Sequence, residues 1–344
     1  MKNGGLKKIL MGMAVLVVIG VLVFVKDPEA QKQETMDSIY DHILLPYAQQ
    51  AVDSCTEFNE VLKHTQAGSR EANLTASFKQ LVLSWKKVQG SYILGEYNDD
   101  MKDTPVFIDN FHVGKGDLFA QLERIVNSDK PASSALYKTS YQTINALEYF
   151  LFSQDEVSER QLELARFVTE NVCFQLQNIY QAYQEFHPQI ISDPKLMLTN
   201  FMDKLSNLTF QIKDWRIGDV MGYTLKYKDT GASYNRSEYP YSHLSSQAMQ
   251  ALFEVQEALI LEQDYLNLGD LIELSGATKQ LETTRDLLKQ ATQDVFVLSD
   301  DDLQTPNEKV KKAYDSVNNL QKDYYNVLIP ALDVSQKILE ADGD

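Results

Sequence analysis

The chain has 344 residues, 44% of them hydrophobic, which is enough to form one large or two ordinary folded domains. It carries 32 basic and 49 acidic side chains, for a formal net charge of −17. Because nucleic-acid binding depends on a dense basic surface, the composition argues against that class of partner.

The N-terminal segment differs from the rest of the chain. Lys2, Lys7 and Lys8 precede an apolar run over residues 9–25, which Lys26 closes. Such a run is typical of a signal segment or a membrane anchor, and its flanking lysines place the N-terminus on the cytoplasmic side. At about 17 residues it reaches the lower limit of a spanning helix. We therefore expect residues 1–31 to form an uncleaved transmembrane signal anchor and a short linker.

Nearly everything after the anchor has a helical period. The clearest seam, in which apolar residues alternate at steps of four and three, runs through residues 74–92, and no segment has the pattern of a strand. We predict an all-α fold of two helical-bundle halves packed together, over residues 32–190 and 191–344. The boundary is placed at HPQIISDPK, where His187 and Pro188 should end one long helix, and Pro330 should kink the last one. Similar stripes cover residues 34–66, 156–186, 195–216, 241–262, 277–296 and 307–339.

The chain has two cysteines, Cys55 and Cys173, both within predicted helices. In an exported protein they could form a disulfide. Two separate, buried apolar thiols fit the sequence equally well.

Glu148 is an acid on an apolar helical stripe. Tyr137, Tyr141, Ile144, Glu148 and Leu151 follow one another at the spacing of one helix face. A buried carboxylate needs a partner, a proton or a metal. Asn145 projects beside it, and the two could grip one ligand, with a hard cation favoured by their oxygen atoms. The alternative is a buried polar pair satisfied by a neighbouring tyrosine or arginine.

Two further segments carry candidate ligands. His112 lies in DTPVFIDNFHVGKGD, and histidine is the commonest metal ligand, although a lone histidine beside an aromatic residue is more often simply packed. Asp117 should cap the helix that follows. Glu238 lies near the start of a helix that Ser242 should cap. The free N–H groups at such a helix start can bind an anion, or the serine side chain can simply satisfy them. The acidic run at residues 300–302 has the composition of a solvated turn.

A long irregular stretch, residues 218–243, contains three glycines and five tyrosines. Long loops inside compact proteins often carry function, though an exposed structural loop is the commoner case. Its tyrosines would suit contact with a partner protein.

Several motifs in the same order resemble the imelysin-like family of bacterial cell-envelope proteins. TINALEYFLF resembles the family's GxHxxE helix, and SWKKVQGSYILGEY is similar to its tryptophan-bearing second helix. SEYPYSHLSSQAMQAL and the terminal ILEADGD also resemble family segments. This sequence departs from the GxHxxE pattern because Thr143 replaces the glycine and Asn145 the histidine, so only Glu148 carries over.

The resemblance implies two related helical bundles, with a site between them, in a protein exported to the bacterial cell envelope. Together with the N-terminal anchor, we expect the protein to be held at the inner membrane and to face the periplasm, or to be secreted there if the anchor is cleaved. Family members are linked to iron uptake or described as peptidases. We therefore expect a non-enzymatic protein that binds a divalent or ferric metal ion, or a small ligand, through Glu148, Asn145 and Glu238, with His112 and Glu148 as metal ligands. The alternatives are a metal-dependent peptidase and a scaffold that contacts another envelope protein.

Overall fold

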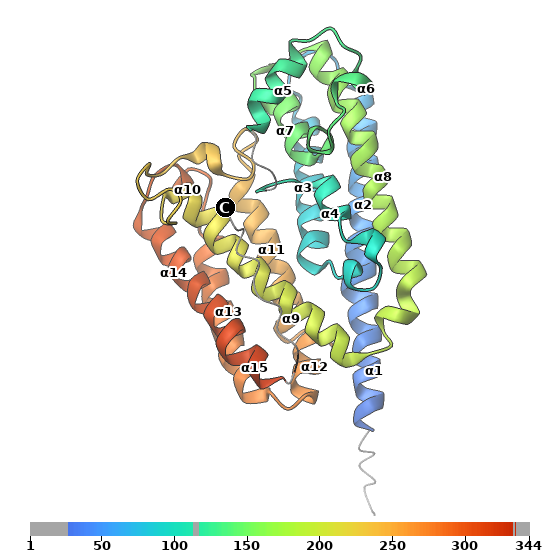
Figure 1. Cartoon of the computed structure of the whole chain (residues 1–344), viewed down its shortest axis with the longest axis vertical. Helices are drawn as coiled ribbons and strands as arrows, with labels where there is room; N and C mark the ends of the chain where they lie inside the picture. Colours follow the sequence, from blue (N-terminus) through green and yellow to red (C-terminus); the bar gives the residue numbers. More distant parts are fainter. Residues whose placement is uncertain (1–26, 113–116, 333, 335–344) are drawn as a thin grey trace, which may run out of the picture.

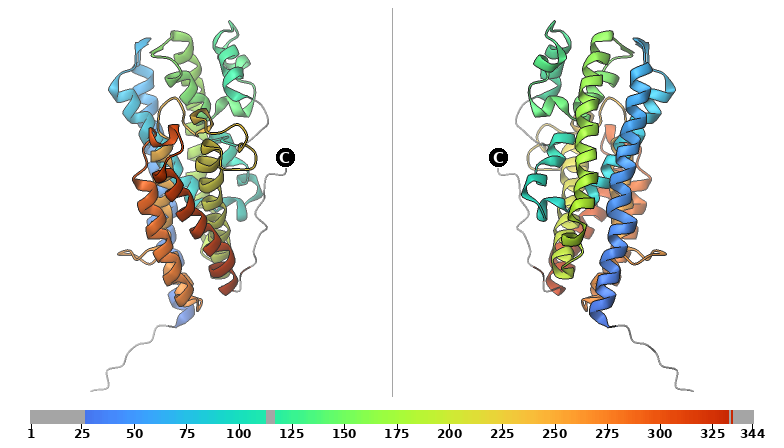
Figure 2. Two further views of the ribbon diagram at one scale, coloured as in Figure 1. Left: turned by 90° about the vertical axis from the view of Figure 1, so that its left-hand side faces the viewer. Right: turned by 90° about the vertical axis from the view of Figure 1, so that its right-hand side faces the viewer.

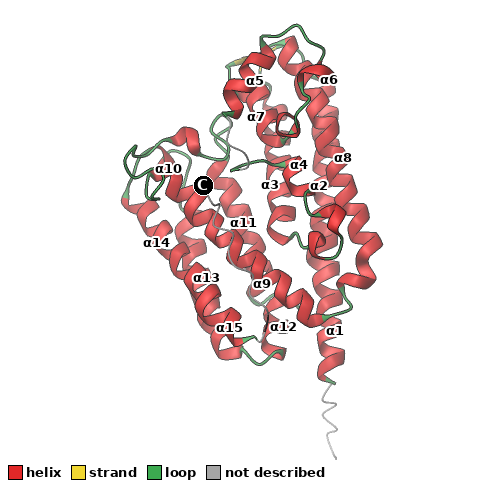
Figure 3. Cartoon of the chain, viewed as in Figure 1, coloured by secondary structure: helices red, strands yellow, loops and turns green. Residues whose placement is uncertain are grey.

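The computed structural model describes residues 27–112, 117–332 and 334, and these residues form an all-α protein, as predicted (Figures 1 and 3). The apolar run expected to anchor the chain falls within residues 1–26 and so lies outside the described residues. Among those that are described, no helix is both long and apolar enough to cross a membrane.

The first half of the chain is built around three long helices and a buried shorter one, α7. Helix α2 packs against α3 and α8, and α7 packs against α8 (Figure 1). The helices of this half are α1 (Pro28–Ile39), α2 (Leu45–His64), α3 (Ala72–Ser91), α4 (Thr104–Ile108), α5 (Leu118–Val126), α6 (Ala132–Ala135), α7 (Ile144–Phe152) and α8 (Glu159–Ile190).

The second half is a bundle of four longer helices that lies beside the first (Figures 1 and 2). Helix α13 packs against α11 and α14, and α14 packs against α9. The helices of this half are α9 (Pro194–Gln211), α10 (Asp219–Met221), α11 (Ser245–Ile260), α12 (Leu268–Leu274), α13 (Thr278–Phe296), α14 (Glu308–Asp323) and α15 (Ile329–Ala331). Two π-helical segments, Ile212–Gly218 and Tyr324–Leu328, also belong to it, and a third, Tyr40–Leu44, joins α1 to α2 in the first half.

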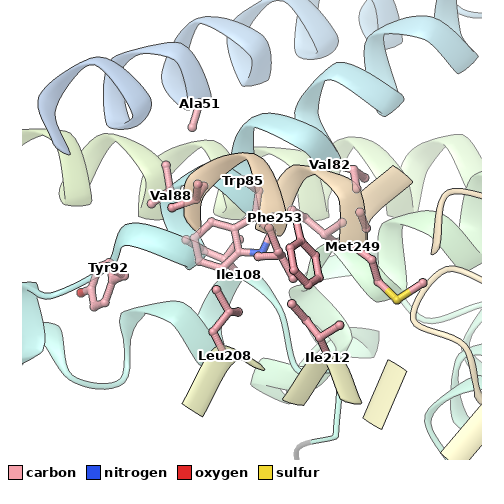
Figure 4. Packing of buried hydrophobic residues seen from close by; sticks show 14 of the residues in the cluster. Ala51, Val82, Trp85, Val88, Tyr92, Ile108, Leu208, Ile212, Met249 and Phe253 are labelled. Atoms are coloured by element: carbon pink, nitrogen blue, oxygen red, sulfur yellow. The ribbon is translucent and has the colours of Figure 1, made fainter. Parts of the chain in front are cut away.

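The two halves share one hydrophobic core. The main contact is between α3 and α11, and a single cluster of buried apolar residues extends through both halves. Figure 4 shows Trp85 of α3 among side chains from neighbouring helices, including Ile108 of α4, Leu208 of α9 and Phe253 of α11. The chain does turn between α8 and α9, but a division into separate domains at residues 190 and 191 stays a prediction.

The cysteines form a disulfide. Cys55 of α2 and Cys173 of α8 are bonded, at a sequence separation of 118. The bond therefore ties together two long helices of the first half, which decides between the two possibilities that the sequence left open.

Three details differ from the sequence-based expectations. Pro188 does not end α8, which continues for two residues to Ile190, so the missing proline N–H removes only one backbone hydrogen bond near the end of the helix. Pro330 lies at the start of the short α15, directly after a π-helical segment. Two strands of two residues each, β1 (Gly68–Ser69) and β2 (Glu156–Val157), pair antiparallel, and runs this short have no readable period.

Candidate functional site

Glu148 is completely buried, as the sequence predicted. Every residue of α7 from Ile144 to Phe152 is buried, so this helix has no solvent face on which an acid could lie. The predicted stripe is nevertheless too long at its N-terminal end. Tyr137 is 72% exposed and lies before α7, because the helix begins only at Ile144.

One oxygen of the Glu148 carboxyl group binds the irregular stretch at residues 218–243 to the first half of the chain. Its Oε1 accepts hydrogen bonds from the backbone N–H of Tyr241 (3.0 Å) and of Ser242 (2.8 Å), and from the Ser242 hydroxyl (2.7 Å). The other oxygen, Oε2, is buried and has no hydrogen-bond partner among the described residues. Burial raises the pKa of Glu148 to about 8, against the opposing effect of these hydrogen bonds. The carboxyl group is therefore mostly protonated at neutral pH.

Asn145 and Thr143, at the variant positions of the family motif, hold the loop that follows α4. The Asn145 Oδ1 accepts a hydrogen bond of 3.0 Å from the backbone N–H of Asn110. The Thr143 hydroxyl donates to the side-chain carbonyl of the same Asn110 (3.0 Å). Both side chains are therefore committed to positioning residues 109–112.

This loop places Asp109 beside Lys86, a buried lysine of α3. The Asp109 Oδ2 accepts from the indole N–H of Trp85 (3.0 Å) and from the Lys86 ammonium group (2.5 Å), and its Oδ1 accepts from the backbone N–H of Phe111. Burial alone would raise the pKa of Asp109, but the Lys86 charge and these donors hold it below its ordinary value. Asp109 is therefore a buried carboxylate.

Glu238 joins the same lysine to a buried arginine. Its Oε1 accepts from Lys86 (2.6 Å) and from the Arg216 Nη2 (2.7 Å), while its Oε2 accepts from the Arg216 Nε (2.8 Å). We call Lys86, Asp109, Arg216 and Glu238 the buried ion-pair network. All four side chains are at most 5% exposed, and they come from different elements in both halves of the chain.

The sequence reasoning identified Glu238 but did not single out Lys86 or Arg216. Lys86 directly follows Trp85, the centre of the apolar seam on α3, so a charged residue lies beside a strongly buried position. Arg216 lies in the π-helical segment Ile212–Gly218, and such segments occur frequently at functional sites. The first of these signals was readable in the sequence, whereas the second requires the structure.

His112 lies at the edge of this region, near a different acid. Its ring stacks on Trp215 with 4.7 Å between ring centroids, and its Nε2 lies 3.4 Å from the Asp219 Oδ2. Burial lowers the pKa of His112 to about 4, with the charges of Arg216 and Lys226 acting in the same direction. The imidazole is therefore neutral at physiological pH.

The predicted metal ligands do not form a recognisable metal site. The Glu148 Oε1 is occupied by three donors, and His112 faces Asp219 instead. Over residues 27–112 and 117–332, no group of three or more His, Cys, Asp and Glu side chains could hold a metal ion. The described side chains thus do not fit a metal at this place, and a metal bound by Glu148 and His112 stays a prediction.

The cap of α11 also differs from the prediction. Ser242 donates its hydroxyl to Glu148 and does not cap this helix, which begins at Ser245. The free N–H groups of Ser245 and Ser246 instead donate to the carboxylate of Asp300, far away in the sequence. Asp300 was expected in a solvated turn, but it is buried because it serves as this cap. Asp117 caps α5 as expected, accepting from the backbone N–H of Ala120.

Comparison with known proteins identifies the family. Residues 44–325 match the family model described as Peptidase_M75: Imelysin. The chain belongs to the imelysin family. No curated protein matches this imelysin.

Two solved structures share the fold of this imelysin. One is an imelysin-like protein from Psychrobacter arcticum 273-4, with a TM-score of 0.73, 14% sequence identity, and coverage of 91% of this chain and 98% of that one. The other is a putative iron-regulated protein A precursor from Parabacteroides distasonis ATCC 8503, with a TM-score of 0.65, 11% identity, and coverage of 90% of this chain and 97% of that one. Identities this low support a common fold and nothing more specific.

Proposed function

We propose that this imelysin is an exported, non-enzymatic binding protein of the bacterial cell envelope, with a role linked to iron, whose small ligand is held between the two bundles at the Glu148 end of the buried ion-pair network. The observation that carries the proposal is the convergence there of a half-partnered, fully buried carboxyl group and charged side chains from both halves. Natural proteins rarely leave buried polar atoms without partners except where a ligand, water or function requires it.

The occupied carboxylates favour binding over catalysis. A metallopeptidase needs three protein ligands and an open position on its metal. Here the two carboxylates of the network are engaged by Lys86 and Arg216. A metal cation here would meet the positive charges of Lys86 and Arg216, and displacing either one would break a buried ion pair, a change that costs several kcal/mol.

Export is supported by the disulfide, because such bonds persist mainly in oxidising compartments outside the cytosol. The Parabacteroides protein with the same fold is described as an iron-regulated precursor, which agrees with both export and a link to iron. The apolar run at residues 9–25 would supply the export signal or the anchor in the inner membrane.

The test is native mass spectrometry, together with elemental analysis, of the full chain purified in mild detergent. A matched Glu148→Gln variant keeps an acceptor for Tyr241 and Ser242 but changes the group at Oε2. We expect a small molecule to be retained by the wild type and lost or reduced in the variant. A stoichiometric metal lost in the variant would restore the metal prediction. Finding no bound mass in either protein, from cells grown with or without iron, would refute the proposal.

A further inference from the structure

The five tyrosines of the irregular stretch at residues 218–243 all contact their own chain. None of them is exposed, and each has a ring contact, a cation–π contact or a hydrogen bond to another described residue. The partners of Tyr223, Tyr227, Tyr234, Tyr239 and Tyr241 are, in this order, Tyr314, Arg236, Asp300, Lys86 and the pair Phe119 and Tyr149. The part of the stretch that is open to a partner therefore consists mainly of other side chains.

Residues 222–233 of this stretch form a loop that is closed at its base. The Ser233 N–H donates to a backbone carbonyl of α10 (2.8 Å). Gly222 has a φ of 71°, and a Cβ there would lie 2.7 Å from the backbone of Gly231, so the close approach of the two ends requires glycine. The Arg236 guanidinium donates to the Gly231 carbonyl (2.7 Å) and fixes the same end. Because the loop is already held in one shape, a partner does not have to order it on binding.

The loop holds an apolar side chain out into solvent. The Thr224 carbonyl accepts hydrogen bonds from the backbone N–H of Tyr227 (3.2 Å) and of Lys228 (3.0 Å), which makes one tight turn. Leu225 in this turn is 84% exposed, more than any other large hydrophobic side chain of the described residues. Lys226 and Lys228 are exposed as well, and neither makes an ion pair with a described residue. We call Leu225, Lys226 and Lys228 the loop tip.

The loop tip is basic, whereas the protein is acidic. Residues 222–233 contain two lysines and one acid, Asp229, for a net charge of +1, against −17 for the whole chain. Salt screens charges beyond about 8 Å, so a partner in contact with the tip interacts mainly with the two lysines. A leucine between two cations matches a surface that offers an apolar recess with carboxylates around it.

The place of the loop in the fold argues against lipid as its partner. Helix α10, which the loop follows, lies at the end of the second half opposite to α12 and α15, whereas α1 packs against α12 (Figure 1). The helical run from Pro194 to Met221 between these two ends is about 40 Å long, at 1.5 Å per residue. A membrane that holds the predicted anchor, just before α1, is therefore out of reach of the tip. Two lysines are also fewer than the roughly four to eight that typically bind anionic lipid.

We propose that the loop tip is a docking site for an acidic segment of a second protein of the cell envelope. Leu225 is buried in the partner, and Lys226 and Lys228 pair with carboxylates of that segment. The inference goes beyond the proposed function, because it concerns a macromolecular partner and not the small ligand. It also replaces the tyrosines of the stretch by these three side chains as the groups that make the contact.

The experiment is site-specific photo-crosslinking in the bacterium that produces the protein. The full chain carries the photoreactive residue benzoylphenylalanine in place of Leu225. We expect a covalent adduct with one other protein, and peptide mass spectrometry should locate the crosslink in a segment with more acidic than basic residues. The same replacement at Tyr137, which is 72% exposed on the first half, is the positional control and should not yield this adduct.

Charge reversal tests how the partner is recognised. In the double variant Lys226→Glu and Lys228→Glu, the yield of the adduct should fall about tenfold or more. Lys279→Glu with Lys289→Glu is the matched control, because it reverses two exposed lysines of α13 and changes the net charge equally, and its adduct should persist. Both double variants should melt at the temperature of the wild type, since all four side chains are exposed.

A synthetic peptide with the sequence of the crosslinked segment then tests the contact with purified components. Titrated against the full chain in mild detergent, it should bind the wild type, and its Kd should rise about tenfold or more in the variant with a reversed loop tip. The Kd should also rise with salt, because the lysines are exposed.

Several results would overturn the inference: no adduct at position 225, an adduct with lipid only or with another copy of this chain only, a crosslinked segment that is not acidic, or an adduct that survives reversal of the loop tip. None of them bears on the proposed ligand. The described contacts of Glu148 are with Tyr241 and Ser242, which lie outside residues 222–233.

Discussion

Replacing Glu148 with glutamine should remove a large part of the pH dependence of stability. A glutamine side chain can still accept from Tyr241 and Ser242, but it cannot ionise. Burial raises the pKa of Glu148 from its ordinary 4.5 to about 8, so the folded protein binds this proton more tightly than the unfolded chain does. The resulting stabilisation is fully present below about pH 4.5 and is lost as the pH rises through about 8.

The size of the effect follows from linkage. Between the two pKa values, each pH unit costs the folded state up to about 1.4 kcal/mol from this one group. From about pH 5 to about pH 7.5 the wild type should therefore lose roughly 3 kcal/mol of unfolding free energy that the variant keeps. Urea unfolding of the full chain, followed by the fluorescence of Trp85 and Trp215, measures both curves. Subtracting them cancels the other titrating groups, including His112.

The matched control is Glu123→Gln, which changes an exposed carboxylate on α5 and should leave the pH dependence of the wild type almost unaltered. Parallel curves for wild type and Glu148→Gln would show that the Glu148 pKa is not raised. The three hydrogen bonds to its Oε1 would then outweigh the cost of burial.

Three more changes, one of them with a matched control variant, test the structural contacts by denaturant unfolding. Reducing the Cys55–Cys173 bond, or replacing both cysteines with serine, should lower the free energy of unfolding by about 4 to 5 kcal/mol, because the bond closes a loop of more than a hundred residues; no change would mean that it does not form. Lys86→Met should cost about 3 to 5 kcal/mol by leaving buried carboxylates short of a partner. Lys87→Met, which breaks a more exposed pair with Glu254, should cost at most about 1 kcal/mol, and equal losses for the two lysines would contradict the assigned burial. Asp300→Ala should cost about 1 to 2 kcal/mol through the loss of the cap on α11, and a neutral result would refute that role.

The helices were predictable because their signal is local. The seam on α3 reads directly from residues 74–92, and Leu74, Phe78, Leu81 and Trp85 are all fully buried. The same reading placed Glu148 in the interior. The start of α7 was placed too early because residues 137–143 continue the helical spacing, although Thr139–Gln142 form a short 3-10 helix and α7 begins only at Ile144. Spacing alone does not mark where a helix begins.

The contacts of the site were not predictable because they join distant segments. Asp300 looks like part of an acidic turn until the fold brings it to the start of α11. Glu238 has no local partner in the sequence, and its cations come from positions 86 and 216. Asn145 could be recognised as polar and buried, but whether it faces a ligand or a backbone N–H depends on where the loop at Asn110 lies.

The continuous core has a consequence for how the protein unfolds. Because α3 packs against α11 and one apolar cluster extends through both halves, separating the bundles would expose the side chains around Trp85 and leave charges of the ion-pair network in water without their partners. Neither half should therefore persist alone once the other has lost its structure. Heat or denaturant should therefore melt the described part of the chain in one transition, which calorimetry would show as a single peak.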